Sequence, residues 1–126
     1  SLKHLILKAS MVLPGKTNPN KVDVATVAAE TVRCMKSAVP PEVPGIAFLS
    51  GGQTEEEASA HLNAMNRLGP HPWVLTFSYA RALQNSALKA WAGNNANIGA
   101  AQAAFLKRAK LNSAAQLGTY TPSMER

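Results

Sequence analysis

The stretch that decides the expected fold is PWVLTFSYARALQNSALKAWAG, residues 72–93. Its first part, from Trp73 to Tyr79, is rich in aromatic and β-branched residues, which is typical of a strand. A helical repeat follows at once, and Gly93 is placed to end it. The residues expected on the shared face of this helix are Leu83, Ala87 and Trp91. The sequence therefore predicts a strand that runs directly into a short helix.

Two further strand and helix pairs are expected upstream. Apolar residues up to about Val12 predict the first strand, and GIAFLSGG (45–52) predicts a second. A helix is expected between them over residues 23–39, with Asp23 as its N-cap. Its apolar stripe would comprise Val24, Val27, Ala28, Thr31, Val32, Met35 and Val39, and Cys34 is also expected to be a small core residue.

The second and last helices carry clear boundary signals. Thr54 with Glu57 three residues later predicts a capping box, and the helix should end near Gly69. Its inner face is expected to be Ala58, His61, Leu62 and Met65. Asn95 or Asn97 is expected to cap a last helix that ends before Gly118. The inward residues predicted for it are Ile98, Ala101, Phe105 and Ala109, and the tail from about residue 119 is expected to be loose.

This order of elements is typical of parallel βαβ units with right-handed crossovers. An extra short helix directly after a strand is how the last turns of a (β/α)₈ barrel form a phosphate site. Such a barrel needs about 250 residues, and the chain has 126. We therefore expect an α/β fold in which residues 1–126 form the closing portion, about the last three βα units, of a TIM barrel.

Composition narrows the classes of function. Apolar residues make up 46% of the chain, and no apolar run is long enough to span a membrane. A lone cysteine excludes an internal disulfide framework and a cysteine-rich zinc site. The net charge of +6 raises nucleic acid as a partner, but the cations are spread and no binding motif is present. A basic RNA-binding module is thus the weakest hypothesis, and neither specific nucleic acid nor membrane is an expected partner.

Lys8 is the first candidate for chemistry. Alternation places His4, Ile6, Lys8 and Ser10 on one strand face, opposite Leu5, Leu7 and Ala9. In a barrel the second set would meet the helices, so Lys8 would point inward, where burial lowers the pKa of an amine. A neutral amine can form a Schiff base with a carbonyl. From the pattern alone, a surface lysine remains the stronger alternative.

Two strand ends could hold an anion. Ser50, Gly51 and Gly52 lead into a capped helix, where glycines allow close backbone approach and a helix N-terminus attracts phosphate. Ser78 shares a strand face with Val74 and Thr76, and Arg81 opens the next helix. Taken singly, the glycine stretch is more typical of an ordinary strand-to-helix turn, and Arg81 is more typical of a solvated surface cation. The three histidines lack metal-ligand spacing, so no metal site is expected.

Together, IAFLSGGQTEEEASAHLNAMN (46–66), the 72–93 stretch and AAQAAFLKRAKLNSAAQLGTY (100–120) resemble the C-terminal part of class I fructose-1,6-bisphosphate aldolase. LILKASMVLPG (5–15) adds to the resemblance, which covers nearly the whole chain. The amino-acid sequence of these stretches is most similar to that of the plant-type enzymes. The resemblance implies that Lys8 forms a Schiff base with a ketose substrate. It also implies that the substrate phosphate is bound by residues after two strands, namely Ser50, Gly51, Gly52, Ser78, Ala80 and Arg81.

The same resemblance implies cleavage of fructose 1,6-bisphosphate to dihydroxyacetone phosphate and glyceraldehyde 3-phosphate, with no metal and no cofactor beyond the covalent imine. A phosphorylated sugar substrate, a homo-oligomer and a cytoplasmic location, with the plastid as the other possibility, are expected with it. Family members usually carry proline, asparagine and threonine where this chain has Ala9, Ser10 and Leu13, and many carry glycine at Ala80. The alternative is a non-catalytic, aldolase-like fragment that binds phosphorylated ligands or a protein partner.

Overall fold

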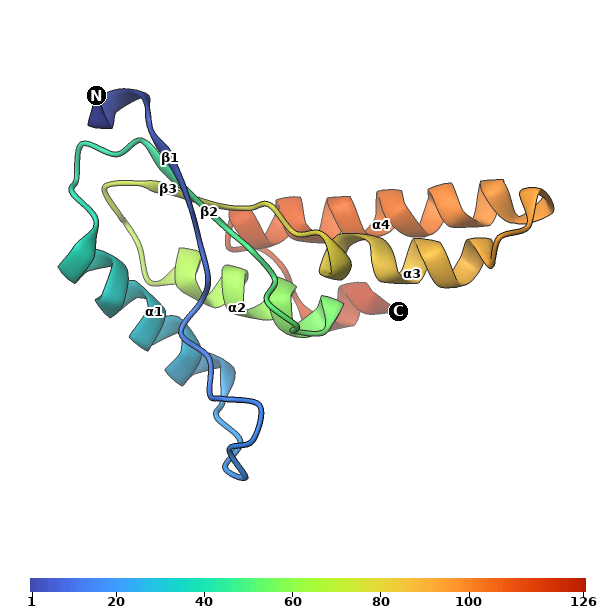
Figure 1. Cartoon of the computed structure of the whole chain (residues 1–126), viewed down its shortest axis with the longest axis horizontal. Coiled ribbons are helices and arrows are strands. Elements are labelled where there is room, and N and C mark those ends of the chain that lie inside the picture. Colours follow the sequence, from blue (N-terminus) through green and yellow to red (C-terminus); the bar gives the residue numbers. More distant parts are fainter.

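Three short strands form a parallel sheet in the order β1-β2-β3. The computed structural model describes all 126 residues (Figure 1). The strands are β1 (Ile6–Ala9), β2 (Gly45–Phe48) and β3 (Val74–Phe77), and the helices are α1 (Val24–Ala38), α2 (Glu55–Arg67), α3 (Arg81–Trp91) and α4 (Ile98–Gln116). Short 3₁₀ turns are η1 (Leu2–His4), η2 (Asn95–Asn97) and η3 (Pro122–Glu125). The predicted order of elements is confirmed.

The helices begin where the sequence places its caps. Asp23 accepts a hydrogen bond of 2.8 Å from the backbone N–H of Thr26 at the start of α1. At the start of α2, Glu57 N–H donates to Thr54 Oγ1 and Thr54 N–H donates to Glu57 Oε2, so the capping box is confirmed. Asn97 precedes α4 but its side chain does not cap the helix. That capping role was predicted for Asn95 or Asn97, whereas Asn94 accepts from Ala96 N–H and caps η2 instead.

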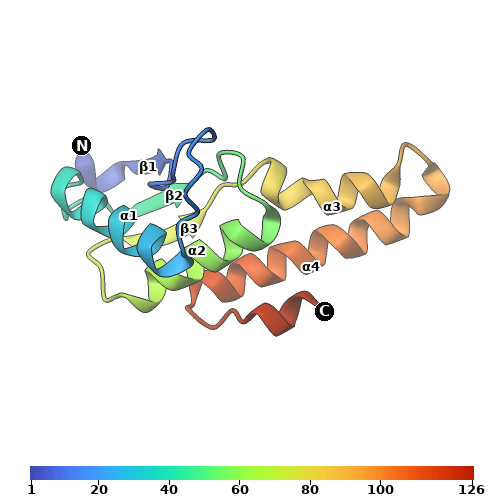
Figure 2. The ribbon, with the colours of Figure 1, turned by 90° about the horizontal axis from the view of Figure 1, so that it is seen from below.

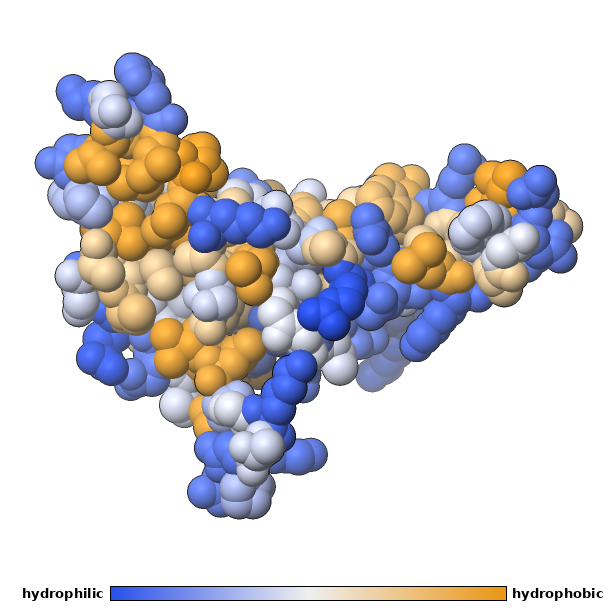
Figure 3. Space-filling model, in the orientation of Figure 1, coloured by the Kyte–Doolittle hydropathy of each residue, from blue (hydrophilic) through white to orange (hydrophobic).

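The sheet is covered on one face only. Helices α2 and α4 and the chain end lie on one side of the strands, and the α3–α4 hairpin projects away from them (Figures 1 and 2). The covered face supplies Leu7, Ala9, Ile46, Phe48, Leu75 and Phe77 to the hydrophobic core. On the other face Ile6 and Val74 are 60% and 56% exposed. Figure 3 looks onto this face and shows hydrophobic residues gathered over the strands.

The core confirms two of the predicted helix faces and corrects others. Helix α1 buries Val27, Ala28, Thr31, Val32 and Met35, and Val39 directly after it is also buried, but Val24 at its first turn is 38% exposed, contrary to the prediction. Helix α2 buries the four residues expected, Ala58, His61, Leu62 and Met65. Cys34 is exposed, and its prediction as a core residue is wrong, because it lies outside the stripe through which α1 packs on α2. His4 lies in η1 and not on the first strand.

The inward face predicted for the last helix is also wrong in part. Ile98 and Phe105 are 44% and 42% exposed, whereas Arg108, Leu111, Asn112 and Ala115 are buried. The cause is the projecting hairpin: the first half of α4 has only α3 beside it, and the second half packs on α2 (Figure 2). No helix has the length and hydropathy needed to cross a bilayer.

We expect the 126-residue chain to self-associate through its sheet, because both edge strands and one apolar face are unpaired. Val74→Lys should weaken this association, since it places a charge on the uncovered face. Leu88→Lys is the matched control, because Leu88 is 54% exposed on α3, in the hairpin that projects away from the sheet (Figure 1). Sedimentation velocity over a range of concentrations measures the effect. A wild-type chain that stays monomeric throughout would contradict the expectation.

Candidate active site at the carboxyl ends of the strands

The ladder bonds run past the strand ends and bring three segments to one edge of the sheet. Leu49 N–H donates to Ala9 O, and Ser78 N–H donates to Phe48 O, each at 2.9 Å. Because all three strands are parallel, their carboxyl ends meet at this edge. Ser50 and Ser78 therefore lie at the same edge of the sheet, each just beyond the end of one of two neighbouring strands.

Lys8 lies on the uncovered face of the sheet. It pairs with Ala47 of β2, which pairs in turn with Thr76 of β3. The predicted alternation is confirmed, since Leu7 and Ala9 pack against the core and Ile6 and Lys8 do not. The low-dielectric surroundings predicted for Lys8 are absent: its side chain is exposed, because no element covers this face of the sheet.

The turn after β2 offers a row of backbone donors. The N–H groups of Ser50, Gly51 and Gly52 donate to no acceptor within the chain. Gly51 and Gly52 have φ of +60° and +89°, a conformation that favours glycine. Ser50 is buried, while both glycines are exposed. Adjacent unpaired N–H groups that lead into a helix start can receive an anion.

The turn after β3 has a similar character. Ser78, Ala80 and Arg81 are all exposed, and Arg81 is the first residue of α3. Ala80 precedes that helix without capping it through a side chain, and the N–H groups of Ala80 and Arg81 donate to nothing in the chain. The structure thus places the six predicted anion-binding residues on two adjacent strand-to-helix turns.

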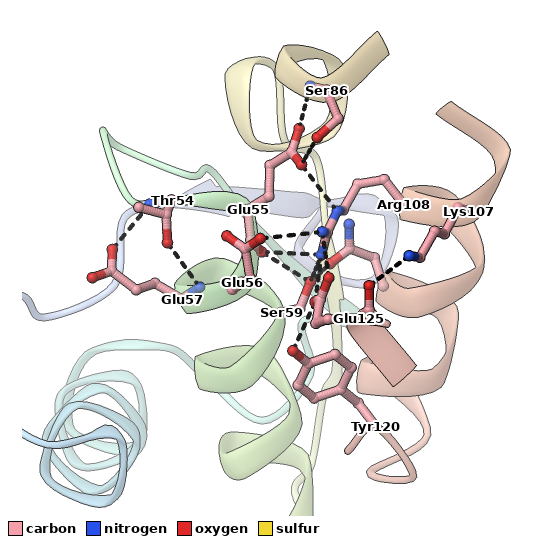
Figure 4. Close-up of polar contacts among 11 residues, drawn as sticks. Thr54, Glu55, Glu56, Glu57, Ser59, Ser86, Lys107, Arg108, Tyr120 and Glu125 are labelled. Carbon is pink, nitrogen blue, oxygen red and sulfur yellow. Dashed lines mark hydrogen bonds and ion pairs between the residues drawn. The ribbon is translucent and has the colours of Figure 1, made fainter. Parts of the chain in front are cut away.

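A buried ionic network behind these turns was not predicted from the sequence. Glu55, the first residue of α2, accepts a hydrogen bond of 2.7 Å from the backbone N–H of Ser86 in α3. It accepts a second hydrogen bond from the hydroxyl of Ser86 (Figure 4). Arg108 of α4 lies 3.4 Å from Glu55 through Nε and 2.7 Å from Glu125 through Nη2. Glu55 and Arg108 are nearly inaccessible. The network joins the helix after each candidate anion-binding turn to α4.

The chain end belongs to this network, in contrast to the loose tail predicted from residue 119. Tyr120 is buried, its N–H donates to Asn63 Oδ1, and its hydroxyl donates to Glu125 Oε1 at 2.8 Å. Glu125 also accepts two hydrogen bonds from Arg108. The tail is held because these polar partners are buried and would otherwise lose their hydrogen bonds.

A signal for Arg108 was present in the sequence. It shares the helical spacing of Leu111, Asn112 and Ala115, so a cation falls on a buried stripe. A cation in such a position needs an acidic partner. The three consecutive glutamates at the start of α2 are the nearest candidates by fold, but nothing local distinguishes Glu55 from Glu56 and Glu57.

Glu125 should make the fold sensitive to acid. Burial alone would raise its pKa, but hydrogen bonds from Arg108 and Tyr120 outweigh this and hold the pKa below its ordinary value of 4.5. Its stabilising contribution is therefore complete above about pH 4.5 and is lost as pH falls through the lowered pKa.

Urea unfolding as a function of pH measures that contribution. We expect wild type to lose stability below pH 4.5 more steeply than Glu125→Gln, because the amide has no proton to bind in this range. Glu42→Gln is the control, since Glu42 is exposed and makes no ion pair. Identical pH profiles for wild type and Glu125→Gln would contradict the assignment.

Comparison with known proteins points to the same family as the sequence resemblance. The family model of class I fructose-bisphosphate aldolase matches residues 1–126. Cytosolic fructose-bisphosphate aldolase 5 of Arabidopsis thaliana is 56% identical over 121 residues, which cover 95% of this chain and 34% of that protein. Fructose-bisphosphate aldolase B of Sparus aurata is 54% identical over 123 residues, covering 97% and 34%. Chloroplastic fructose-bisphosphate aldolase 2 of Arabidopsis thaliana is 55% identical over 117 residues, covering 93% and 29%.

A solved structure agrees. Fructose-bisphosphate aldolase of Plasmodium falciparum, in complex with TRAP and a small-molecule inhibitor, superposes with a TM-score of 0.89 at 50% identity. The superposition covers 92% of this chain and 33% of that one.

The parallel βαβ units and the superposition on a solved aldolase define part of an aldolase-type TIM barrel, and the predicted fold class is confirmed. The chain belongs to the class I fructose-bisphosphate aldolase family. It spans about a third of the length of the curated relatives it matches, and these correspond to it in their C-terminal part.

Proposed function

We propose that this chain contributes the imine-forming lysine and one phosphate-binding site to a class I fructose-bisphosphate aldolase. Within a complete barrel, the protein would cleave fructose 1,6-bisphosphate to dihydroxyacetone phosphate and glyceraldehyde 3-phosphate. The observation that carries the proposal is the common edge: Lys8 lies on the face that would line the barrel, and both anion-binding turns follow the neighbouring strands. Membership of the family supports it.

The chemistry needs a neutral amine at Lys8. Its nitrogen attacks the ketose carbonyl carbon, water leaves, and a protonated imine forms. The hydroxyl on the fourth carbon of the sugar then loses its proton as the bond between the third and fourth carbons breaks. The electron pair of that bond moves toward the imine, which gives an enamine and the free aldehyde. A proton returns to the enamine carbon, and water releases dihydroxyacetone phosphate and the amine. The groups that move these protons are expected in the part of the barrel outside this chain.

The two turns would hold one phosphate of the substrate. Backbone N–H groups of Ser50 and Gly51 provide neutral donors, and Arg81 provides a charge-assisted pair from the facing turn. Gly52 and Ala80 leave their backbones open to the ligand, and Ser78 adds a hydroxyl. Fixing the phosphate would place the carbonyl against Lys8, so the turns act by orientation.

The exposure of Lys8 favours a second candidate function for the 126-residue chain on its own. A solvated amine without proton-transfer partners is a poor catalyst, and Ala9, Ser10 and Leu13 alter the family pattern around it. We expect the isolated chain to bind phosphorylated ligands or a protein partner without normal turnover. In the complete protein we propose a homo-oligomeric enzyme of the cytoplasm, with the plastid as the alternative compartment.

Imine trapping tests the proposal. This chain would be grafted in place of the matching segment of the cytosolic Arabidopsis relative, which restores a full barrel. Borohydride reduction with dihydroxyacetone phosphate, followed by intact-mass and peptide analysis, should yield one adduct on Lys8. A folded graft with no adduct, or with the adduct on another lysine, would overturn the proposed role of Lys8 and favour the non-catalytic alternative.

A further inference from the structure

A cavity lies next to the candidate active site, between the loop after β1 and the start of α2. Its volume is about 310 Å³, the lower end of the range for small-molecule sites. Residues 13–22 form one wall, at the bottom of Figure 1, and the turn after β2 forms another. Gly51 and Gly52 line it, but Lys8, Ser78 and Arg81 do not.

The floor of the cavity presents a hydrogen-bond acceptor that has no partner in the chain. The side-chain NH₂ of Gln53 donates a hydrogen bond of 2.8 Å to Ser50 O. The side-chain oxygen of Gln53 therefore faces His61 Nδ1 and must accept a hydrogen bond from it. His61 is 6% exposed, and burial lowers its pKa despite the opposing effect of Glu57. The imidazole is therefore neutral at pH 7 with its proton on Nδ1. Its Nε2 has no partner in the chain and is left to accept from an occupant.

The rim of the cavity is cationic. Lys16 and Lys21 line it, are exposed, and make no ion pair. The Lys16 Cε lies 3.7 Å from where a Cβ on Gly52 would stand, so this amine lies directly over the turn. Glu57 is the one acidic residue of the lining, and one of its oxygens already accepts from Thr54 N–H. An anionic group is favoured at the lysines, and it would avoid the side of the cavity next to Glu57.

These features require two properties in one ligand. The lysines favour an oxyanion, and His61 Nε2 needs a hydroxyl or N–H donor. Leu13 and Val27 supply apolar wall between them, which suits a short carbon chain. A bare inorganic anion would leave the histidine unpaired at neutral pH if it carried no proton to donate.

We propose that this cavity binds a small hydroxylated oxyanion, either a phosphate ester or a hydroxycarboxylate, with its charge at Lys16 and Lys21 and its hydroxyl on His61 Nε2. Because Gly51 and Gly52 border both sites, an occupant would also restrict the turn that carries the candidate substrate-phosphate donors. Binding at the cavity does not depend on the proposed aldolase function. The ligand would be held by Lys16, Lys21 and His61, and none of these residues is assigned to that function.

NMR of the 126-residue chain tests the site directly. Histidine ring signals would be followed during titration with glycerol 3-phosphate, malate and inorganic phosphate. We expect saturable shifts of the His61 ring with one or both of the first two probes, and the arm that succeeds identifies the phosphate ester or the hydroxycarboxylate. His61→Asn should weaken binding about tenfold, the effect of one ordinary hydrogen bond. Lys16→Ala with Lys21→Ala should weaken it at least as much, and Lys89→Ala should not.

Three results would overturn the proposal. The first is no saturable shift of the His61 ring with glycerol 3-phosphate or malate. The second is equal affinity for inorganic phosphate with no effect of His61→Asn, which would mean a charged rim only. The third is loss of probe binding in Arg81→Ala but not in His61→Asn, which would place the probe at the candidate active site. Backbone spectra of each variant confirm that the chain remains folded, and the third result leaves the proposed function intact while removing this site.

Discussion

Replacing Lys8 by methionine in the grafted barrel is expected to lower kcat for cleavage of fructose 1,6-bisphosphate by roughly 10⁴-fold or more, as loss of a covalent nucleophile does elsewhere. Methionine keeps a long, unbranched side chain on the same strand face but has no amine. Since Lys8 is exposed in the 126-residue chain and contributes no contact to its core, the same substitution should leave the free energy of unfolding of that chain unchanged. The expected loss is therefore chemical and not structural.

Steady-state kinetics and borohydride trapping measure this prediction together. Lys89→Met is the matched control: Lys89 lies in the last turn of α3, is exposed, and should leave both rate and adduct unaffected. Residual cleavage above a tenth of the unsubstituted rate in Lys8→Met, with an adduct still forming, would show that another amine makes the imine.

The fold was predictable because its signals are local. Strand composition, the Asp23 cap and the Thr54–Glu57 capping box each act over a few residues, and the structure places all of them as expected. Period-two alternation also assigned the faces of β1 and β3, since a residue cannot change face without a shift in register. The inner face of helix α2 was also predicted correctly, because residues three and four apart lie on the same side of a helix.

The errors arose where burial depends on distant parts of the chain. Phe105 has the spacing of a core residue, but the helix turn that carries it projects beyond the rest of the fold and is covered by α3 alone. Lys8 was assigned to the correct face, but its exposure depends on what covers that face, which no spacing in this sequence specifies. Its role as a Schiff-base amine rests on resemblance and remains a prediction, as do the roles of Ser50 and Arg81.

The ionic network illustrates a different limit. Glu55 and Arg108 are 53 residues apart, and neither has a local partner that marks it as buried. The tail was predicted to be loose, yet Glu125 supplies the carboxylate that balances Arg108. Such pairs become predictable only when the packing of α2 against α4 is known, because the need for a countercharge arises from that packing.

Arg108→Met should destabilise the chain by about 3 kcal/mol, because it leaves Glu55 and Glu125 without their cation in a largely desolvated site. Methionine fills much of the space of the arginine stem, so little of the loss comes from packing. Urea unfolding can be followed by the fluorescence of Trp73, which is buried in the native state. Arg33→Met is the control, since the ion pair of Arg33 with Glu30 lies at the surface and should contribute little.

The cost should come from the stranded carboxylates and not from the loss of the arginine itself. Adding Glu55→Gln and Glu125→Gln to Arg108→Met is therefore expected to recover part of the lost stability, although each glutamine substitution alone should destabilise. A triple variant less stable than Arg108→Met would show instead that the network stabilises by its geometry, through the bonds of Glu55 to Ser86 and of Tyr120 to Glu125. Either way, Glu55 joins α2 to α3, so the same variants should also loosen the two turns that carry Ser50 and Arg81. Faster amide exchange at those turns in Arg108→Met than in Arg33→Met would demonstrate that link.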